Sequence, residues 1–78
     1  MDTKEKVKEI VLEILDISET ELVYDEPLGE SMGVTSVLMV ELLAELENQF
    51  DIDIPQDDAV NLRTVNAVVS YIEEKIGS

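Results

Sequence analysis

The feature that most limits how this chain can fold is the apolar periodicity of residues 37–50. Apolar residues recur there at intervals of three and four, which places them on one side of an α-helix. This core-facing stripe consists of Met39, Leu42, Leu43, Leu46 and Phe50. The first helical residue is expected to be Ser36 or Val37, just after the turn residue Gly33. Ser36 is a favoured N-cap residue, and Thr35 competes with it for that role.

Two further segments have the same periodicity. The stretch from Thr3 to Asp16 predicts an amphipathic helix, with Asp2 or Thr3 as its N-cap. Its apolar stripe is Val7, Ile10, Val11, Ile14 and Leu15. Thr64 is expected to cap a final helix that ends at Gly77. The core-facing residues of that helix are Val65, Val68, Val69, Ile72 and Ile76.

The connections between these helices differ in length. Residues 17–35 are expected to form a long loop that apolar side chains anchor to the bundle. These anchors are Leu22, Val23, Leu28, Met32 and Val34. Gln56–Leu62 is expected to form one short helix with Ala59, Val60 and Leu62 turned inward. The predicted fold is therefore all-α, a four-helix bundle of three longer helices and one short helix with a long first loop.

The chemistry open to the chain is limited by what it lacks. With 78 residues, it is expected to form a single domain over positions 1–78, too small to enclose a large active site. It contains no cysteine and no histidine, so a thiolate nucleophile, a disulfide and a Ser-His-Asp triad are all excluded. We therefore expect that the chain is not an enzyme.

The charge of the chain indicates what it binds. Lys and Arg total 5 against 19 Asp and Glu, a net charge of −14. Such a chain repels nucleic acid and anionic membranes and attracts proteins with basic patches. No signal peptide or membrane-spanning run is visible, so a cytoplasmic location is expected. The chain is also expected to be a monomer. The acidic tract Asp51, Asp53, Asp57 and Asp58 is interrupted by Pro55 and lacks the glycine of an EF-hand, so no metal site is expected.

Ser36 has two interpretations on the residues alone. It caps the helix and does nothing else, or its exposed hydroxyl accepts a phosphodiester at a helix start whose N–H groups favour phosphate. Because the chain offers no histidine base, a separate enzyme would have to carry out that modification. The face opposite the core stripe is equally open to two interpretations, a docking surface or a solvated face. It comprises Val37, Val40, Glu41, Ala44 and Glu47.

The order of these segments resembles the acyl carrier protein family over nearly the whole chain. Met32–Val37, which reads Met-Gly-Val-Thr-Ser-Val, looks like the family's Leu-Gly-x-Asp-Ser-Leu attachment motif. Val40–Phe50 is similar to the family's second helix. Asp51–Pro55, Thr64–Val65 and Tyr71–Ile72 then follow in the family's order. Each piece is a weak signal, and their shared order and spacing make the resemblance specific.

The resemblance implies that Ser36 carries 4′-phosphopantetheine, transferred from coenzyme A by a phosphopantetheinyl transferase. The thiol of this arm would hold acyl intermediates as thioesters for the enzymes of a dissociated fatty-acid or polyketide synthase. Basic patches of those enzymes would dock on a face formed by Val37, Leu38, Val40, Glu41, Ala44 and Glu47. The acyl chain would fold back into a pocket formed by Val7, Leu46, Ile54, Ala59, Leu62 and Val68.

Three positions depart from the family pattern. Thr35 stands where the family usually has Asp, and Leu38 and Asn48 stand where an acidic residue is common. The partner face is therefore more apolar than that of a general fatty-acid carrier. This suits a specialised carrier of secondary metabolism, and it is equally compatible with neutral drift within fatty-acid synthesis. The alternatives are a peptidyl or aminoacyl carrier of the same fold, and an unmodified acidic module that binds a basic protein.

Overall fold

Helices account for all of the regular structure that the computed structural model describes, which covers residues 2–77. In chain order they are α1 (Thr3–Leu15), the 3-10 turn η1 (Glu19–Glu21), α2 (Leu28–Ser31), α3 (Ser36–Phe50), α4 (Gln56–Ala59) and α5 (Val65–Ile76). The all-α prediction is confirmed. The prediction of one short helix is incomplete, because η1 and α2 lie within the segment expected to be loop.

Polar side chains fix the starts of the first and last helices as predicted. Asp2 Oδ1 accepts a hydrogen bond from Glu5 N at 2.8 Å, and Thr64 Oγ1 accepts one from Ala67 N at 3.0 Å. Each bond satisfies one of the amide groups that have no partner inside the helix. Gly77 follows α5 with a φ of 76°, the left-handed conformation that glycine adopts without a steric penalty.

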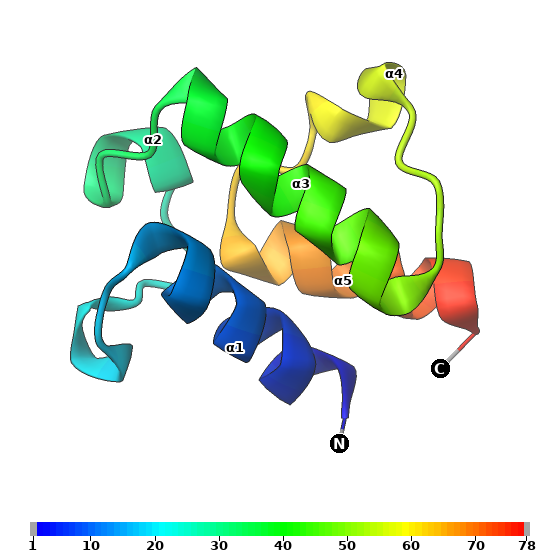
Figure 1. The fold of residues 1–78 in the computed structure, drawn as a ribbon, viewed down its shortest axis with the longest axis horizontal. Helices are drawn as coiled ribbons and strands as arrows, with labels where there is room; N and C mark the ends of the chain where they lie inside the picture. Colours follow the sequence, from blue (N-terminus) through cyan, green and yellow to red (C-terminus); the bar gives the residue numbers. More distant parts are fainter. Residues whose placement is uncertain (1, 78) are drawn as a thin grey trace.

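The three long helices surround one hydrophobic core. Figure 1 shows α1 and α3 running in opposite directions next to each other, with α5 packed behind them. The buried apolar side chains come mostly from the predicted stripes, and Leu22, Leu28 and Leu62 are added from the connections. The full set is Val7, Ile10, Val11, Leu22, Leu28, Leu42, Leu46, Leu62, Val65, Val68, Val69 and Ile72. Burial of this set is the main stabilisation of the fold.

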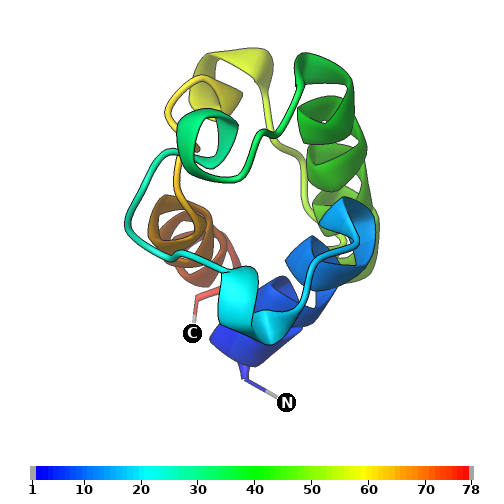
Figure 2. The same ribbon diagram turned by 90° about the vertical axis from the view of Figure 1, so that its left-hand side faces the viewer.

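The long connection between α1 and α3 is held against the rest of the bundle. Leu22 and Leu28 are buried as predicted, and Tyr24 packs against the core, which the sequence did not indicate. The Tyr24 carbonyl accepts a hydrogen bond from Asn66 N at 2.9 Å, and Leu28 N donates to the Arg63 carbonyl at 2.8 Å. In Figure 2 the connection passes beside α5 before it forms α2. The connection that leads into α3 is therefore held by contacts to Arg63 and to the first turn of α5.

Two side chains predicted to face the core do not. Val60 is 60% exposed, because α4 ends at Ala59 and the helical spacing assumed for Gln56–Leu62 does not continue. Ile76 is 41% exposed, since it is the last residue of α5 and lies beyond the end of the core. Both errors occur at helix ends, where periodicity is least informative.

Candidate functional site

The site is centred on the first turn of α3. Thr35 is the N-cap residue, with extended backbone angles, and its Oγ1 accepts a hydrogen bond from Leu38 N at 3.2 Å. Met39 N donates to the Thr35 carbonyl at 2.9 Å. Of the two caps that the sequence allowed, Thr35 is confirmed and Ser36 is wrong, because Ser36 is already the first helical residue. Within residues 2–77 the exposed Ser36 hydroxyl has no hydrogen-bond partner.

The turn before α3 depends on a glycine. Gly33 has a φ of 63°, in the left-handed region, and a Cβ built there would meet no atom within 4 Å. The requirement is therefore conformational and not steric. Leu28 O accepts hydrogen bonds from Met32 N at 3.1 Å and from Val34 N at 3.3 Å, which closes the chain around the end of α2. This turn redirects the backbone so that Ser36 lies at the surface.

A pocket next to Ser36, here called the α2 pocket, has a volume of about 350 Å³. It lies between the start of α3, the short helix α2 and the segment after α4. Its lining residues are Pro27, Leu28, Gly29, Glu30, Val34, Thr35, Ser36, Met39, Ala59, Val60, Leu62 and Arg63. Two of the residues predicted for an acyl pocket, Ala59 and Leu62, belong to this lining.

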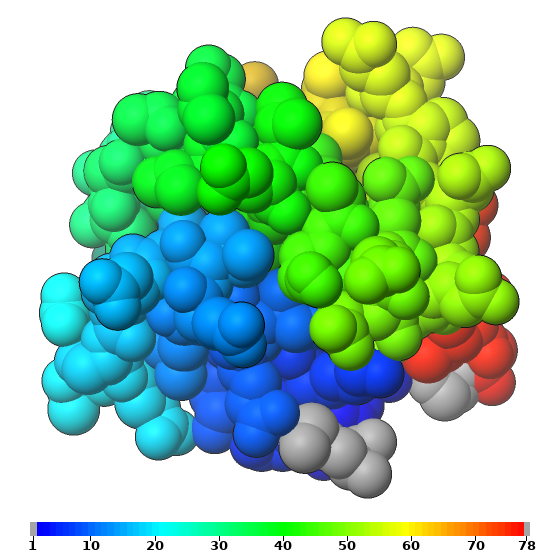
Figure 3. Space-filling model, in the orientation of Figure 1, coloured from blue at the N-terminus to red at the C-terminus, as the bar shows by residue number. Residues whose placement is uncertain are grey.

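A second depression, the α4 groove, has a volume of about 670 Å³ and runs between α3 and α4. Figure 3 shows the start of α3 in green and α4 in yellow at one edge of the molecule, with a notch between them. The groove is lined by Ser36, Met39, Val40, Leu43, Ala44, Glu47, Ile54, Gln56, Ala59 and Val60. Ser36 therefore borders both depressions, and each has mostly apolar walls.

The structure divides the predicted acyl-pocket residues into two groups. Ile54 lines the α4 groove, Leu62 lines the α2 pocket, and Ala59 lines both. Val7, Leu46 and Val68 are fully buried in the closed core and line neither depression. Only the first group is thus within reach of a molecule that enters from Ser36 without movement of the helices.

The predicted docking face is mostly exposed. Val37 and Val40 are each 67% exposed, and Glu41 and Ala44 are exposed too. Leu38 is half-buried. These residues form an apolar strip along α3 with one carboxylate beside it, and such a strip suits contact with another protein better than contact with water.

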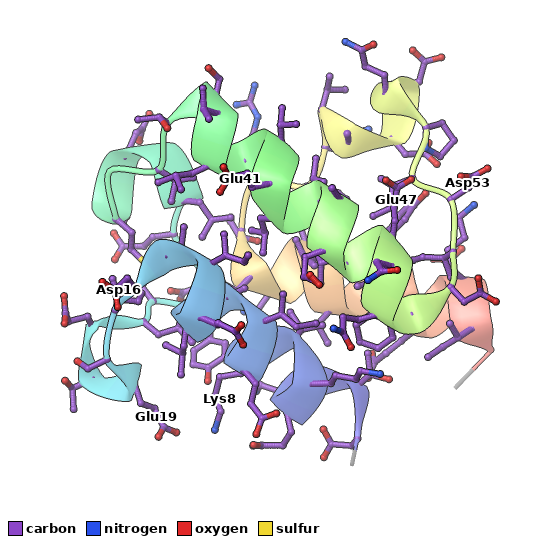
Figure 4. The ribbon with its side chains drawn as sticks, viewed as in Figure 1. Lys8, Asp16, Glu19, Glu41, Glu47 and Asp53 are labelled. Carbon is purple, nitrogen blue, oxygen red and sulfur yellow. The ribbon has the colours of Figure 1, made fainter. Side chains whose placement is uncertain are left out.

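Glu47 differs from the rest of the predicted docking face. Figure 4 shows Glu41 and Glu47 pointing to different sides of α3, with Glu47 toward the loop that contains Asp53. Glu47 Oε2 accepts a hydrogen bond from Ile54 N at 2.8 Å, and the side chain is half-buried. Its carboxylate therefore positions the α3–α4 loop and forms one wall of the α4 groove.

A side-chain hydrogen bond joins α4 to α5. Tyr71 Oη donates to Asp58 Oδ2 at 2.7 Å. Partial burial, and after it the hydrogen bond to Asp58, raises the pKa of Tyr71 to about 12. The phenol therefore remains protonated and able to donate this bond over the physiological pH range.

Several residues that line the two depressions were missed by the sequence interpretation, and two of them come from the segment after α4. Arg63 and Val60 both line the α2 pocket, although they are 27 and 24 positions away from Ser36 in the chain. Arg63 reaches the pocket because its carbonyl binds Leu28 N, a contact that no periodic pattern reveals. The available signal was compositional, since Arg63 is the single arginine of the chain.

Two further properties concern metal binding and membranes. In the part of the chain that the structure describes, no group of three or more Asp, Glu, His or Cys side chains could hold a metal ion. Over the same residues, no helix has the length and apolar character needed to cross a membrane.

Comparison with known proteins gives consistent results. Residues 5–72 match the family model described as the phosphopantetheine attachment site. The chain is 35% identical over 75 residues to the acyl carrier protein of Amoebophilus asiaticus, covering 96% of this chain and 94% of that protein. It is also 35% identical over 72 residues to the acyl carrier protein of Chlorobium phaeobacteroides, covering 92% of each.

Two solved structures are similar to nearly the whole of this chain. A proposed acyl carrier protein from Anaplasma phagocytophilum matches with a TM-score of 0.87 at 28% identity, covering 95% of this chain and 88% of that one. A proposed acyl carrier protein from Mycobacterium tuberculosis matches with a TM-score of 0.81 at 27% identity, covering 99% of this chain and all (100%) of that one.

Proposed function

The chain belongs to the acyl carrier protein family, whose cofactor is 4′-phosphopantetheine, and on that premise we propose that Ser36 is the attachment residue. The observation that carries this proposal is the state of the Ser36 hydroxyl. It is exposed in the first turn of α3, and Thr35 takes over the capping that would otherwise engage it. Ser36 also borders both depressions, so an arm attached there can enter either one.

The residues around Ser36 fit a phosphodiester. The start of α3 offers amide groups and the positive end of the helix dipole, and Arg63 lines the adjoining pocket. When bound, the cofactor supplies a thiol, which a chain without cysteine does not have. The chain also has no histidine to activate the Ser36 hydroxyl, so the base must come from a phosphopantetheinyl transferase.

The function follows from this arrangement. The protein is a carrier and not itself a catalyst: it holds acyl intermediates as thioesters and presents them to the enzymes of a dissociated fatty-acid or polyketide synthase. The apolar walls of the α4 groove, with Ile54 and Ala59, shelter an acyl chain. Partner enzymes contact the strip formed by Val37, Val40, Glu41 and Ala44, and their surfaces combine basic with apolar residues.

Loading of Ser36 is tested by mass spectrometry. The protein is incubated with coenzyme A and a transferase of broad specificity, and the wild type is expected to gain one phosphopantetheine. Ser36→Ala is expected to gain none while keeping its helical circular dichroism. Ser31→Ala is the matched control, because Ser31 is an exposed serine close to the same turn. A wild type that gains no mass, or a gain that persists in Ser36→Ala, contradicts the proposal.

A further inference from the structure

Arg63 differs from every other cation of the described chain. Lys8 Nζ pairs with Glu19 at 2.8 Å and with Glu5 at 3.0 Å, and Lys6 Nζ donates to the Gln49 carbonyl at 3.0 Å. Lys4 and Lys75 lie over tyrosine rings, at 4.9 Å and 5.6 Å from the ring centroids. Between residues 2 and 77, Arg63 alone among the cations has a side chain without such a partner.

Arg63 lies at the pocket that Ser36 also borders. The two residues line it together, although Ser36 is in α3 and Arg63 is in the connection between α4 and α5. The Arg63 carbonyl binds Leu28 N at 2.8 Å, which fixes the residue against α2. The other charged residue of the lining is Glu30, and no ion pair joins it to Arg63 within the described residues.

We propose that Arg63 binds the phosphodiester on Ser36 and thereby sets the direction in which the arm leaves the α3 start. The inference rests on the proposed attachment at Ser36. A phosphodiester keeps one negative charge. Because the chain has a net charge of −14, this group finds little electrostatic attraction elsewhere on the surface. A guanidinium is suited to this contact, because it offers paired N–H groups to two phosphate oxygens. Arg63 is a positioning residue and takes no part in acyl chemistry.

The contact has a consequence for stability. It joins the start of α3 to the segment before α5, so it stabilises the folded holo protein and is absent from the apo protein. Exposed ion pairs are weak, and for a domain of this size the expected gain in melting temperature is roughly 1–5 °C at low salt. The gain disappears at high salt because both groups are solvent-accessible.

The experiment compares apo and holo forms of the wild type, Arg63→Gln, Arg63→Lys and Lys75→Gln. Mass spectrometry first establishes loading at Ser36, and then melting temperatures and the ³¹P resonance of the phosphodiester are recorded at low and high salt. The holo-minus-apo difference in melting temperature is expected to fall in Arg63→Gln, to be partly kept in Arg63→Lys, and to be unchanged in Lys75→Gln. Lys75→Gln removes the same charge from the far end of α5.

The ³¹P resonance gives a readout that does not depend on stability. At low salt the resonance of the wild type is expected to differ from that of Arg63→Gln, and the two are expected to converge as salt is added. Identical resonances in the wild type and Arg63→Gln would overturn the proposed role of Arg63 but not the attachment site. An equal loss of melting temperature in the apo and holo forms of Arg63→Gln would have the same meaning. Absence of loading at Ser36 would overturn the attachment site as well, so the two failures are distinguishable.

Discussion

At the scale of single residues, the sequence allows both Thr35 and Ser36 to cap α3, and in the structure Thr35 is the cap. Both residue types form N-caps, so the pattern cannot decide between them. The choice depends on where the first turn begins, which is set by the left-handed backbone of Gly33 and by the bond from Val34 N to the Leu28 carbonyl. These contacts lie outside the helix, and helical periodicity carries no information about them.

Replacing Thr35 is expected to weaken the fold while leaving Ser36, the proposed attachment residue, in place. Thr35→Ala deletes the oxygen that accepts from Leu38 N, and loss of such a cap costs about 1 kcal/mol of unfolding free energy. Urea denaturation followed by circular dichroism measures this as a lower midpoint at an unchanged slope. Thr35→Ser keeps the hydroxyl and is expected to match the wild type; an equal loss in both variants would rule out capping as the cause.

The same contact explains the departure of Thr35 from the family pattern. Aspartate, which usually stands at this position in the family that the chain resembles, is also a favoured N-cap. Threonine therefore keeps the structural role and removes a negative charge beside Ser36. Together with the exposed Val37 and Val40, this makes the neighbourhood of Ser36 more apolar. The use of this face for docking stays a prediction.

At the scale of elements, the long helices were predicted well. Of the short ones, α4 was predicted with its end at Leu62 and not at Ala59, and η1 and α2 were not predicted. The stripes of α1, α3 and α5 extend over several turns, so single exceptions do not disturb them. α4 has four residues, and beyond it Asn61 N and Leu62 N each bond to a carbonyl three positions earlier, both at 3.0 Å. With this tighter winding Val60 is exposed and does not face the core.

The hydrogen bond from Tyr71 to Asp58 predicts that the stability of the fold depends on pH. The pKa of Tyr71 is raised from 10.0 to about 12 in the folded protein, so between these values the native state keeps a proton that the unfolded state releases. The contribution of Tyr71 to stability is therefore complete below about pH 10 and is lost as the pH rises toward 12. Urea midpoints of the wild type are expected to fall over this range more steeply than those of Tyr71→Phe.

Absorbance of the phenolate checks the same prediction directly. The chain contains two tyrosines, so the titration is carried out in Tyr24→Phe, where Tyr71 is the single phenol. Asp58→Asn removes the carboxylate that accepts the hydrogen bond, and it is expected to move the titration of Tyr71 to lower pH. An unchanged titration would show that burial alone raises the pKa.

At the scale of the whole molecule, charge is distributed unevenly. Lys4, Lys6 and Lys8 lie in α1, so three of the five cations are in one helix and the remaining surface is strongly acidic. Figure 4 shows Lys8 next to Glu19, the pair that ties α1 to η1, whereas Asp16, Glu41, Glu47 and Asp53 are spread over the rest of the view. The hydrogen bond between Lys8 and Glu19 lowers the pKa of the glutamate and raises that of the lysine.

This charge distribution predicts that salt stabilises the fold. The radius of gyration is 11.4 Å, about the Debye length at 0.1 M salt, so at lower ionic strength nearly all of the like charges repel one another. Salt also weakens the attraction between Lys8 and Glu19, but 19 acidic residues against 5 basic ones make repulsion the larger effect. The melting temperature should rise between ~10 mM and ~150 mM NaCl, by roughly 4–8 °C for each kcal/mol of repulsion that is screened. Because no described cluster is built to hold a metal, MgCl₂ of equal ionic strength should have a similar effect. A melting temperature that stays flat would mean that the acidic surface is already neutralised by local contacts.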